Sequence, residues 1–458
     1  MRRKITKRRT RTTAAQKAHT LNRELMPEPK PPATDEEYEM RRDKAGDNYG
    51  VMIINTLANL YSEKMFEAAR DACEKDRRFF YAVGEQEDLE CSISKVITSS
   101  KYCLGVLYVH GTMMPAYDAL VKHAAERDVR EDVAEATRLC TTVLRVSNAQ
   151  VSNLCDNAKW IYACNGVTPY FVDTDPRVIL FNQISLLEVP EKIIPGTGHK
   201  ATYTTIDRGG VLGRGLPARE PEQMVEALKD ADLYLGHEIA SYIMAKRHTE
   251  DKGTPGDLAI PDSFNGVVFV PLHCTWDAQM ISYGGLFGRN YDLLKTVLDN
   301  VPNGWLVVAK PHPFGDKGLL GAADPVIKLA EDRPNCVLSE HSIHDILPLV
   351  DVVVTLNSSV GMEALCYDLP IIVAGEAMYQ NIHGVTWKPR NLGELIIMLR
   401  NVDTRVTPDD DVCPRAIAFF WGTYLMVRDN KHALETRCRV LIAETLGEAE
   451  TWTMDEAE

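Results

Sequence analysis

The feature that most constrains the fold is a regular alternation of short apolar runs and helical patterns between residues 266 and 373. Hydrophobic residues occupy successive positions in the apolar runs, so both faces of each strand must be buried. Strands of this kind, separated by helices, form a parallel sheet that helices cover on both sides. The pattern therefore predicts a Rossmann-like nucleotide-binding unit. The predicted strands are 266–271, 305–309, 335–338, 351–355 and 369–373, and the predicted helices are 287–299, 323–331, 342–349 and 360–367.

The first half of the chain contains the same two kinds of segment, with weaker periodicity. Alternating helices and buried strands indicate a second α/β layer structure. Two further helical stretches, 413–428 and 431–445, follow the regular region, and we expect them to pack back on the first domain. The predicted elements of the first half are helices 51–77 and 117–139 and strands 104–109 and 178–181.

The length of the chain suits two domains with extensions, since 458 residues and 45% hydrophobic content are enough for two cores. A segment rich in turn formers, His248 to Phe264, follows a long helical pattern from Met224 to Arg247, and we place the domain boundary there. Four prolines between residues 27 and 32 disfavour a helix, so ordered structure is expected from about Tyr49. The predicted organisation is a basic arm without ordered structure (1–45), an N-terminal α/β domain (46–255), a C-terminal Rossmann-like domain (256–410), two C-terminal helices (411–445) and an acidic tail (446–458).

Charge is distributed unevenly along the chain. The formal net charge of -14 argues against general nucleic-acid binding. Residues 1–23 nevertheless hold nine Lys or Arg and no carboxylate, whereas residues 444–458 hold six acids and no base. The basic arm is either a solvated tail or a contact for anionic lipid at the inner membrane surface. We expect a cytoplasmic protein, since the sequence has neither a secretory signal nor a run of ~20 apolar residues.

The eleven cysteines are odd in number and include no Cys-x-x-Cys spacing. Neither a disulfide framework nor a zinc site is indicated. We expect reduced, mostly buried thiols and no metal.

Polar residues follow several of the predicted strands. His273 and Asp277 come after the first strand of the regular region, Lys310 and His312 after the second, and a loop beginning at Asn357 after the fourth. The carboxyl ends of parallel strands meet at one edge, where ligands of open α/β sheets bind. The pattern predicts a phosphate site at this edge.

The loop that begins at Asn357 enters a helix through small polar residues. Ser358, Ser359 and Gly361 would leave backbone N–H groups and hydroxyls accessible to an anion. The alternative is a simple helix cap. Glu363, one turn further on, would accept hydrogen bonds from a ribose, or would simply suit the helix dipole.

The remaining candidates carry charge or a titratable group. His312 stands between two prolines that hold its backbone, as a side chain directed at a leaving phosphate requires, and Lys310 is either a phosphate contact or a solvated strand end. Asp277 is the carboxylate best placed to act on a sugar as nucleophile, ion-pair partner or base, or it caps the following helix.

These motifs resemble the bacterial capsule polysaccharide biosynthesis proteins, a family that includes retaining β-Kdo glycosyltransferases. The similarity covers residues 265–390, and the chain differs from the usual family pattern at His273, where many members have glutamine. The resemblance is carried by Val268-Phe269-Val270-Pro271-Leu272, Asp277, Lys310-Pro311-His312-Pro313, Ser358-Ser359-x-Gly361-x-Glu363-Ala364-Leu365 and Pro370 to Tyr379, with a weaker match at Thr202 to Gly210.

The resemblance implies a GT-B fold, in which two Rossmann-like domains face each other across a cleft. It further implies a CMP-activated Kdo-like donor, a glycan or glycolipid acceptor on the side of the N-terminal domain, and no obligatory metal or other cofactor. His312 would contact the donor phosphate, Ser358 and Ser359 would line its pocket, and Asp277 would be the catalytic carboxylate. Further candidate substrate contacts are His273, Gln279, Asp207 and Tyr379.

Two other function classes fit the same pattern. A nucleotide-sugar epimerase or hydrolase with the GT-B fold would consume donor without an acceptor. A non-catalytic scaffold would bind the nucleotide-sugar without turnover, and replacing Asp277 would then leave its behaviour unchanged.

Overall fold

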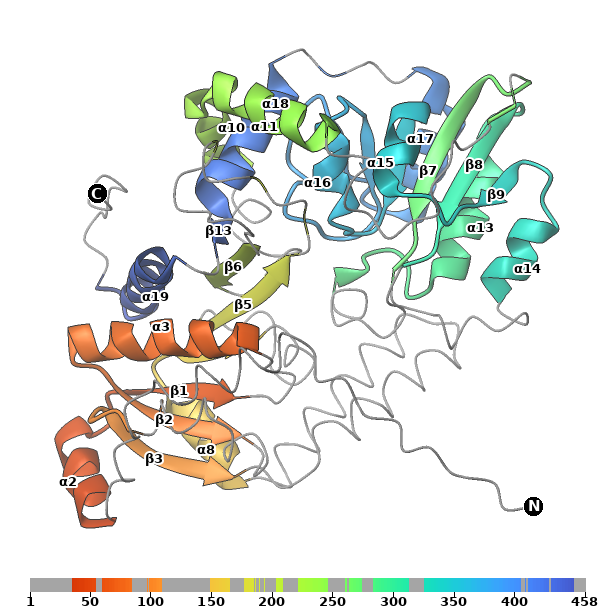
Figure 1. Cartoon of the computed structure of the whole chain (residues 1–458). Coiled ribbons are helices and arrows are strands. Elements are labelled where there is room, and N and C mark those ends of the chain that lie inside the picture. The colour runs from red at the N-terminus through yellow and green to blue at the C-terminus, as the bar shows by residue number, and fades with distance from the viewer. Residues whose placement is uncertain are drawn as a thin grey trace, which may run out of the picture.

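The computed structural model contains two mostly parallel sheets with helices around them (Figure 1). The residues that the structure describes are 35–54, 60–84, 97, 99–108, 149–164, 177–184, 186, 189, 193, 203–208, 221–245, 260–261, 263–273, 283–312, 325–404, 408, 411–427 and 430–448.

The first sheet has the strand order β13-β6-β5-β4-β1-β2-β3. Strands β1 to β5 pair in parallel, and the part β3-β2-β1-β4-β5 has the order of a Rossmann unit. Strands β6 and β13 extend it as antiparallel neighbours. The strands are β1 (Tyr49–Ile54), β2 (Phe79–Gly84), β3 (Cys103–Tyr108), β4 (Ile161–Cys164), β5 (Val178–Ile184), β6 (Tyr203–Arg208) and β13 (Met426–Val427).

The second sheet is parallel throughout and has the order β12-β11-β10-β7-β8-β9. All six residues of β7 are buried, because helices cover both faces, as its unbroken apolar run predicts. The strands are β7 (Gly266–Pro271), β8 (Trp305–Lys310), β9 (Cys336–Leu338), β10 (Val352–Thr355), β11 (Ile371–Val373) and β12 (Thr386–Trp387).

The helices surround both sheets (Figure 1). They are α2 (Asp35–Ala45), α3 (Leu60–Asp76), α8 (Ala149–Asn157), α10 (Pro221–Asp230), α11 (Leu233–Ala245), α13 (Asn290–Asn300), α14 (Pro325–Glu331), α15 (Ile343–Ile346), α16 (Val360–Leu365), α17 (Leu392–Arg400), α18 (Val412–Phe419) and α19 (Lys431–Thr445), with 3₁₀ turns at Leu347–Leu349 and Val402–Thr404 and a π-helical turn at Phe420–Tyr424.

The predicted fold class is confirmed: the protein is α/β with two Rossmann-like units. Predicted elements between residues 266 and 373, and the predicted helix 431–445, agree with the observed ones to within a few residues. The predicted helix 413–428 is wrong in its second half, where a π-helical turn and strand β13 follow α18. The predicted helix 51–77 is wrong at its start, where β1 lies. Val51 and Ile53 pack in one core and Met52 and Ile54 in another, so this strand is buried on both faces and its pattern mimics a buried helix. The predicted helix 117–139 lies outside the described residues.

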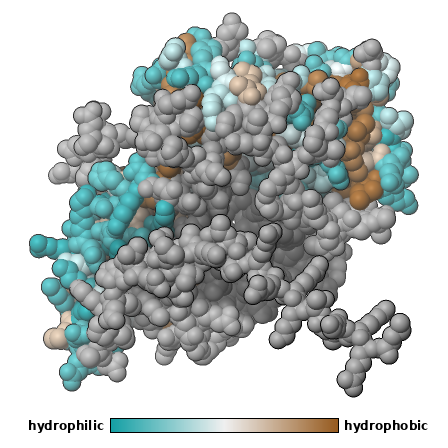
Figure 2. All heavy atoms as spheres, viewed as in Figure 1, coloured by the Kyte–Doolittle hydropathy of each residue, from teal (hydrophilic) through white to brown (hydrophobic). Residues whose placement is uncertain are grey.

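Of the two predicted C-terminal helices, α19 packs back on the first unit as expected, whereas α18 packs on α10, α11 and α16, in the apolar cluster that includes residues of β7 and β10. Helix α19 packs along α3, and β13 joins the first sheet beside β6. Lys431 and Arg439 of α19 pair with Asp71 and Asp76 of α3, with N···O distances of 2.6 Å and 2.8 Å. The surface over α3 and α19 is accordingly hydrophilic (Figure 2).

Helix α2 lies within the segment 1–45 for which we expected no ordered structure, so that expectation is wrong for Asp35–Ala45. The guanidinium of Arg41 donates to the carbonyl oxygens of Ser100 and Cys103, at 3.2 Å and 2.9 Å, which fixes the helix against β3. Residues 1–34 and the tail beyond residue 448 lie outside the described part of the chain.

The other predicted boundaries, including the division at residue 255, stay predictions. The long helical pattern before that boundary forms two helices, α10 and α11. Asp232 accepts hydrogen bonds from the amides of Tyr234 and Leu235 and so begins α11. No helix in the described ranges is long and apolar enough to cross a membrane. Cytoplasmic location and membrane contact through residues 1–23 stay predictions.

Candidate functional site

The candidate site lies at the carboxyl edge of the second sheet. Because all its strands are parallel, the residues that follow β7, β8, β10 and β11 lie at one edge. Chain order reverses between the neighbours β7 and β10, which makes their junction the topological switch point. His273 follows β7 and Asn357 follows β10, so both residues border the position where ligands of such sheets bind.

His273 is held in place through its backbone. The side-chain amide of Asn290 accepts a hydrogen bond from the backbone N–H of His273 at 3.0 Å. It also donates one to the backbone carbonyl of His273 at 2.7 Å. Only 8% of His273 is exposed, and burial, with a smaller contribution from nearby His312, lowers its pKa to about 4. The ring is therefore neutral near pH 7. The sequence did not reveal Asn290, because an asparagine at a helix start is common.

His312 and His273 come together at the ends of neighbouring strands. His312 is half-buried, two residues beyond β8, and it is close enough to His273 to influence its titration. The predicted meeting of the loops after β7 and β8 is therefore found in the structure.

The side chain of Lys310 contacts the loop that follows β9. Its Nζ donates to the carbonyl oxygen of His341 at 2.5 Å, and the carbonyl of Glu340 lies 3.4 Å away. These contacts connect the end of β8 to the loop after β9. Lys310 thus has a structural contact, and its role at a phosphate stays a prediction.

The loop after β10 is a closed turn. The hydroxyl of Ser358 accepts from the amide of Val360 at 3.3 Å, and the amides of Gly361 and Met362 donate to the carbonyls of Ser358 and Ser359. The first-turn amides therefore have acceptors within the turn, and the expectation that they stay available to an anion is wrong. The N-cap residue of α16 is Ser359, which makes no side-chain capping hydrogen bond, and the hydroxyl of the preceding Ser358 accepts from a first-turn amide instead. Both Ser358 and Ser359 are partly exposed residues of this edge.

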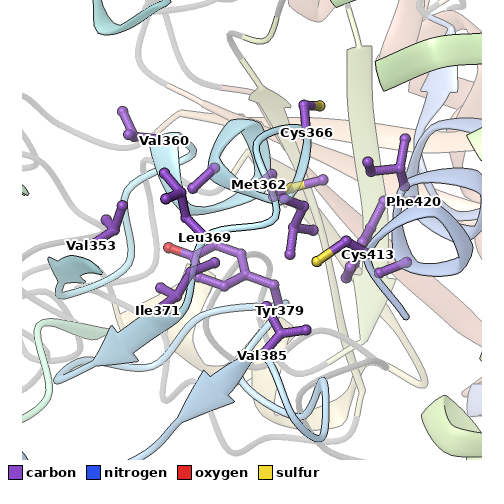
Figure 3. Packing of buried hydrophobic residues seen from close by; sticks show 14 of the residues in the cluster. Val353, Val360, Met362, Cys366, Leu369, Ile371, Tyr379, Val385, Cys413 and Phe420 are labelled. Atoms are coloured by element: carbon purple, nitrogen blue, oxygen red, sulfur yellow. The ribbon is translucent and has the colours of Figure 1, made fainter. Parts of the chain in front are cut away.

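Gly361 is required by packing against Tyr379. A Cβ atom at position 361 would lie 2.3–2.5 Å from atoms of the Tyr379 side chain. Tyr379 is 1% exposed, burial raises its pKa, and its hydroxyl donates to the Ser358 carbonyl at 2.5 Å. Figure 3 shows this ring within the apolar cluster below α16. Tyr379 therefore supports the loop, and its predicted substrate contact is wrong because its side chain is buried.

Glu363 faces α15. Its Oε1 lies 3.7 Å from Nε2 of His344, and both side chains are buried. Nδ1 of His344 lies 3.0 Å from the hydroxyl of Tyr367. The predicted ribose contact of Glu363 is therefore not supported, since its carboxylate is engaged in this buried group.

Asp207 lies on β6 in the first sheet, not at the edge of the second sheet just described. It accepts hydrogen bonds from the Tyr424 hydroxyl at 2.8 Å and from the Arg208 amide at 2.7 Å. Strand β6 runs antiparallel to β5, and Asp207 pairs with Leu180 near the start of β5. Its side of the sheet is thus opposite to the carboxyl ends of β1 to β5. Asp207 therefore has structural contacts, and its predicted substrate contact stays a prediction.

Asp277 and Gln279 lie outside the described residues, so their roles stay predictions. Asn357 is described and is 5% exposed at the switch point. Within the described ranges, no three His, Cys, Asp or Glu side chains are grouped as metal ligands would be.

Comparison with known proteins gives a family match over the second sheet. Residues 236–395 match the family model described as capsule polysaccharide biosynthesis protein. Protein FixF of Sinorhizobium fredii (strain NBRC 101917 / NGR234) is 27% identical over 196 residues, which make up 40% of this chain and 42% of FixF. The chain therefore spans less than half the length of that relative.

Two solved structures are distantly similar. Thermosulfurimonas dismutans KpsC, a beta Kdo 2,7 transferase, is 19% identical, with 61% of this chain and 82% of that chain covered and a TM-score of 0.36. Anabaena Alr3699/HepE in complex with UDP-glucose is 11% identical, with 88% and 100% covered and a TM-score of 0.32. At these TM-scores neither structure adds to the fold already described. Residues 236–395 therefore match the same family that the sequence motifs resemble.

Proposed function

We propose that the protein is a glycosyltransferase that moves a sugar from a nucleotide-sugar donor to a glycan or glycolipid in polysaccharide synthesis. The proposal rests on one observation: the family match and the candidate site occupy the same part of the chain. The family match, residues 236–395, contains β7 to β12 and therefore the whole switch-point edge with His273, His312 and Asn357. Because a fold alone does not define an activity, the polar residues at this edge are what support it.

The donor we propose is a CMP-activated Kdo-like 3-deoxy-ulosonic acid. The support is the set of motifs shared with the capsule polysaccharide biosynthesis proteins, above all Lys310-Pro311-His312-Pro313 and the Ser358-Ser359 loop. In this proposal the acceptor approaches from the side of the first sheet. The reaction needs no redox cofactor, because glycosyl transfer exchanges one C–O bond for another.

In the proposed reaction each site residue has its own role. The oxygen of the acceptor hydroxyl forms a bond to the anomeric carbon and its proton passes to the solvent. The bond from that carbon to the phosphate oxygen breaks, and the nucleotide leaves with the bonding electrons. His312 donates a hydrogen bond to the phosphate and so stabilises the charge that develops on it. Asp277 acts on the anomeric centre, where positive charge develops in the transition state. The hydroxyls of Ser358 and Ser359 border the phosphate.

A thermal-shift panel tests the donor. Wild-type protein and His312→Ala are each heated with CMP, UDP, GDP and ADP. A bound nucleotide stabilises the fold by RT ln(1 + [L]/Kd), about 2.7 kcal/mol at roughly 100 times Kd. We expect CMP to raise the Tm of the wild type, and His312→Ala to lose most of that rise. His432→Ala is the matched control, since His432 is exposed on α19.

The outcomes separate the competing functions. A preference for UDP would contradict the CMP-activated donor, and no response to any of the four nucleotides would contradict the proposal as a whole. Incubation with donor alone then distinguishes transfer from rearrangement. Consumption of donor without acceptor, with release of an altered sugar, would identify an epimerase or hydrolase instead. Binding without any turnover, unaffected by Asp277→Ala, would identify a scaffold.

A further inference from the structure

His273 combines deep burial with an unused hydrogen-bonding atom. Only 8% of the residue is exposed, and its Nε2 atom is buried with no hydrogen-bond partner in the described part of the chain. Buried polar atoms in proteins nearly always have a partner, because leaving one unpaired is costly. Such an atom at a ligand-binding edge indicates that a ligand supplies the missing partner.

The position of the ring is built into the fold. Both hydrogen bonds of Asn290 act on the backbone of His273, and Asn290 is itself 5% exposed as the first residue of α13. Helix α13 packs its buried face, including Leu293 and Leu294, against the second sheet. The backbone that carries the imidazole is therefore held in place without a ligand, which helps to preorganise the contact.

The surroundings of His273 identify the chemical group that it would contact. The residue follows β7, the strand at the switch point, and it lies next to His312 at the end of β8. A neutral imidazole can donate one hydrogen bond without carrying charge. A phosphoryl group has several acceptor oxygens, so it can receive hydrogen bonds from two neighbouring side chains at once.

We propose that His273 is a further donor-binding residue, which donates a hydrogen bond from Nε2–H to a phosphoryl oxygen of the nucleotide beside His312. This inference rests on the proposed function, since it assigns a second contact to the same phosphate. It also assigns the tautomer, with the proton on Nε2. The nucleoside part of the ligand makes no contact with His273 in this arrangement.

Binding measurements by calorimetry with phosphorylated and unphosphorylated ligands test the assignment. The probes are CMP, UDP, GDP and ADP, each beside its nucleoside: cytidine, uridine, guanosine and adenosine. The variants are His273→Leu, which removes the donor, and His273→Gln, whose amide N–H replaces Nε2–H without titrating. His237→Gln is the control, because His237 is exposed on α11.

We expect His273→Leu to bind the preferred nucleotide roughly tenfold more weakly, the usual effect of one hydrogen bond to a charged group. Its affinity for the nucleoside stays unchanged, and His273→Gln recovers nucleotide affinity to within about threefold. Equal affinity of wild type and His273→Leu for the nucleotide would overturn the inference. So would an equal loss for nucleotide and nucleoside, or a His273→Gln variant as weak as His273→Leu.

The two proposals fail in different ways. If none of the four nucleotides binds the wild type, the proposed function fails, and His273 has no phosphate to contact. If a nucleotide binds and His312→Ala weakens it while His273→Leu does not, the proposed function stands and this inference alone is wrong. The melting temperatures of both variants without ligand show whether either has lost its fold.

Discussion

The two sheets share a Rossmann strand order but use their strand ends differently. In the second sheet every strand is parallel, and the polar residues that follow the strands lie at one edge, where Nε2 of His273 has no hydrogen-bond partner among the described residues. In the first sheet β6 runs antiparallel, and its buried Asp207 is engaged by Tyr424 and Arg208. A polar residue near a strand end is therefore a candidate ligand contact in one sheet and a structural contact in the other.

Acidification is expected to have the largest effect, and it acts through His273 of the second sheet. His273 has a pKa of about 4 in the folded protein, below the usual value of 6.5, so the unfolded chain binds more protons in this window. The contribution of His273 to the free energy of unfolding is therefore fully present above pH 6.5. It is lost as the pH falls toward 4, by roughly 3 kcal/mol in total. Urea unfolding of wild type and His273→Gln between neutral and acid pH measures it.

We expect wild type to lose more stability than His273→Gln over that range. His432→Gln is the matched control, because His432 is exposed on α19. Parallel pH profiles for wild type and His273→Gln would show that the ring of His273 is not held neutral by the fold.

Replacing Asp207 gives the opposite pattern to replacing His273. Asp207→Ala leaves the Tyr424 hydroxyl and the Arg208 amide without their acceptor, and we expect a loss of about 2 kcal/mol in the free energy of unfolding. Nucleotide affinity should not change. His273→Leu should instead lose affinity and keep its stability. Urea unfolding combined with calorimetry measures both quantities, with exposed Asp43→Ala as control. A large loss of nucleotide affinity in Asp207→Ala would instead indicate that Asp207 contacts the ligand.

The smallest expected effect concerns the charged contact of α19 with the first unit. The Lys431 side chain is 63% exposed, so its ion pair with Asp71 is largely solvated. We expect Lys431→Ala to lose less than about 1 kcal/mol at low salt, and almost nothing at about 1 M salt. Urea unfolding at both ionic strengths tests this, with Lys328→Ala on α14 as control. A loss that persists at high salt would mean that Lys431 contributes by packing.

The sequence was most informative where strands are buried on both faces and separated by helices. The elements from β7 to β11, the order of the polar loops and the helix 431–445 all follow from local patterns and match the structure closely. The sequence was least informative at β1. There Ile53 and Leu57 are spaced as in a helix, yet Val51 to Ile54 pair with β2 and β4, because long-range pairing overrides a local pattern.

The amino-acid sequence by itself determined that a parallel sheet follows residue 266 and that His273, His312 and the Ser358 loop share one of its edges. Apolar continuity and strand order are local properties, which is why they can be read from the chain. Only the tertiary structure decided which polar groups are already engaged. Glu363 faces His344, Tyr379 supports Ser358, and Asp207 accepts a hydrogen bond from Tyr424. The partner of a buried polar atom comes from a distant segment, so only the folded arrangement reveals it.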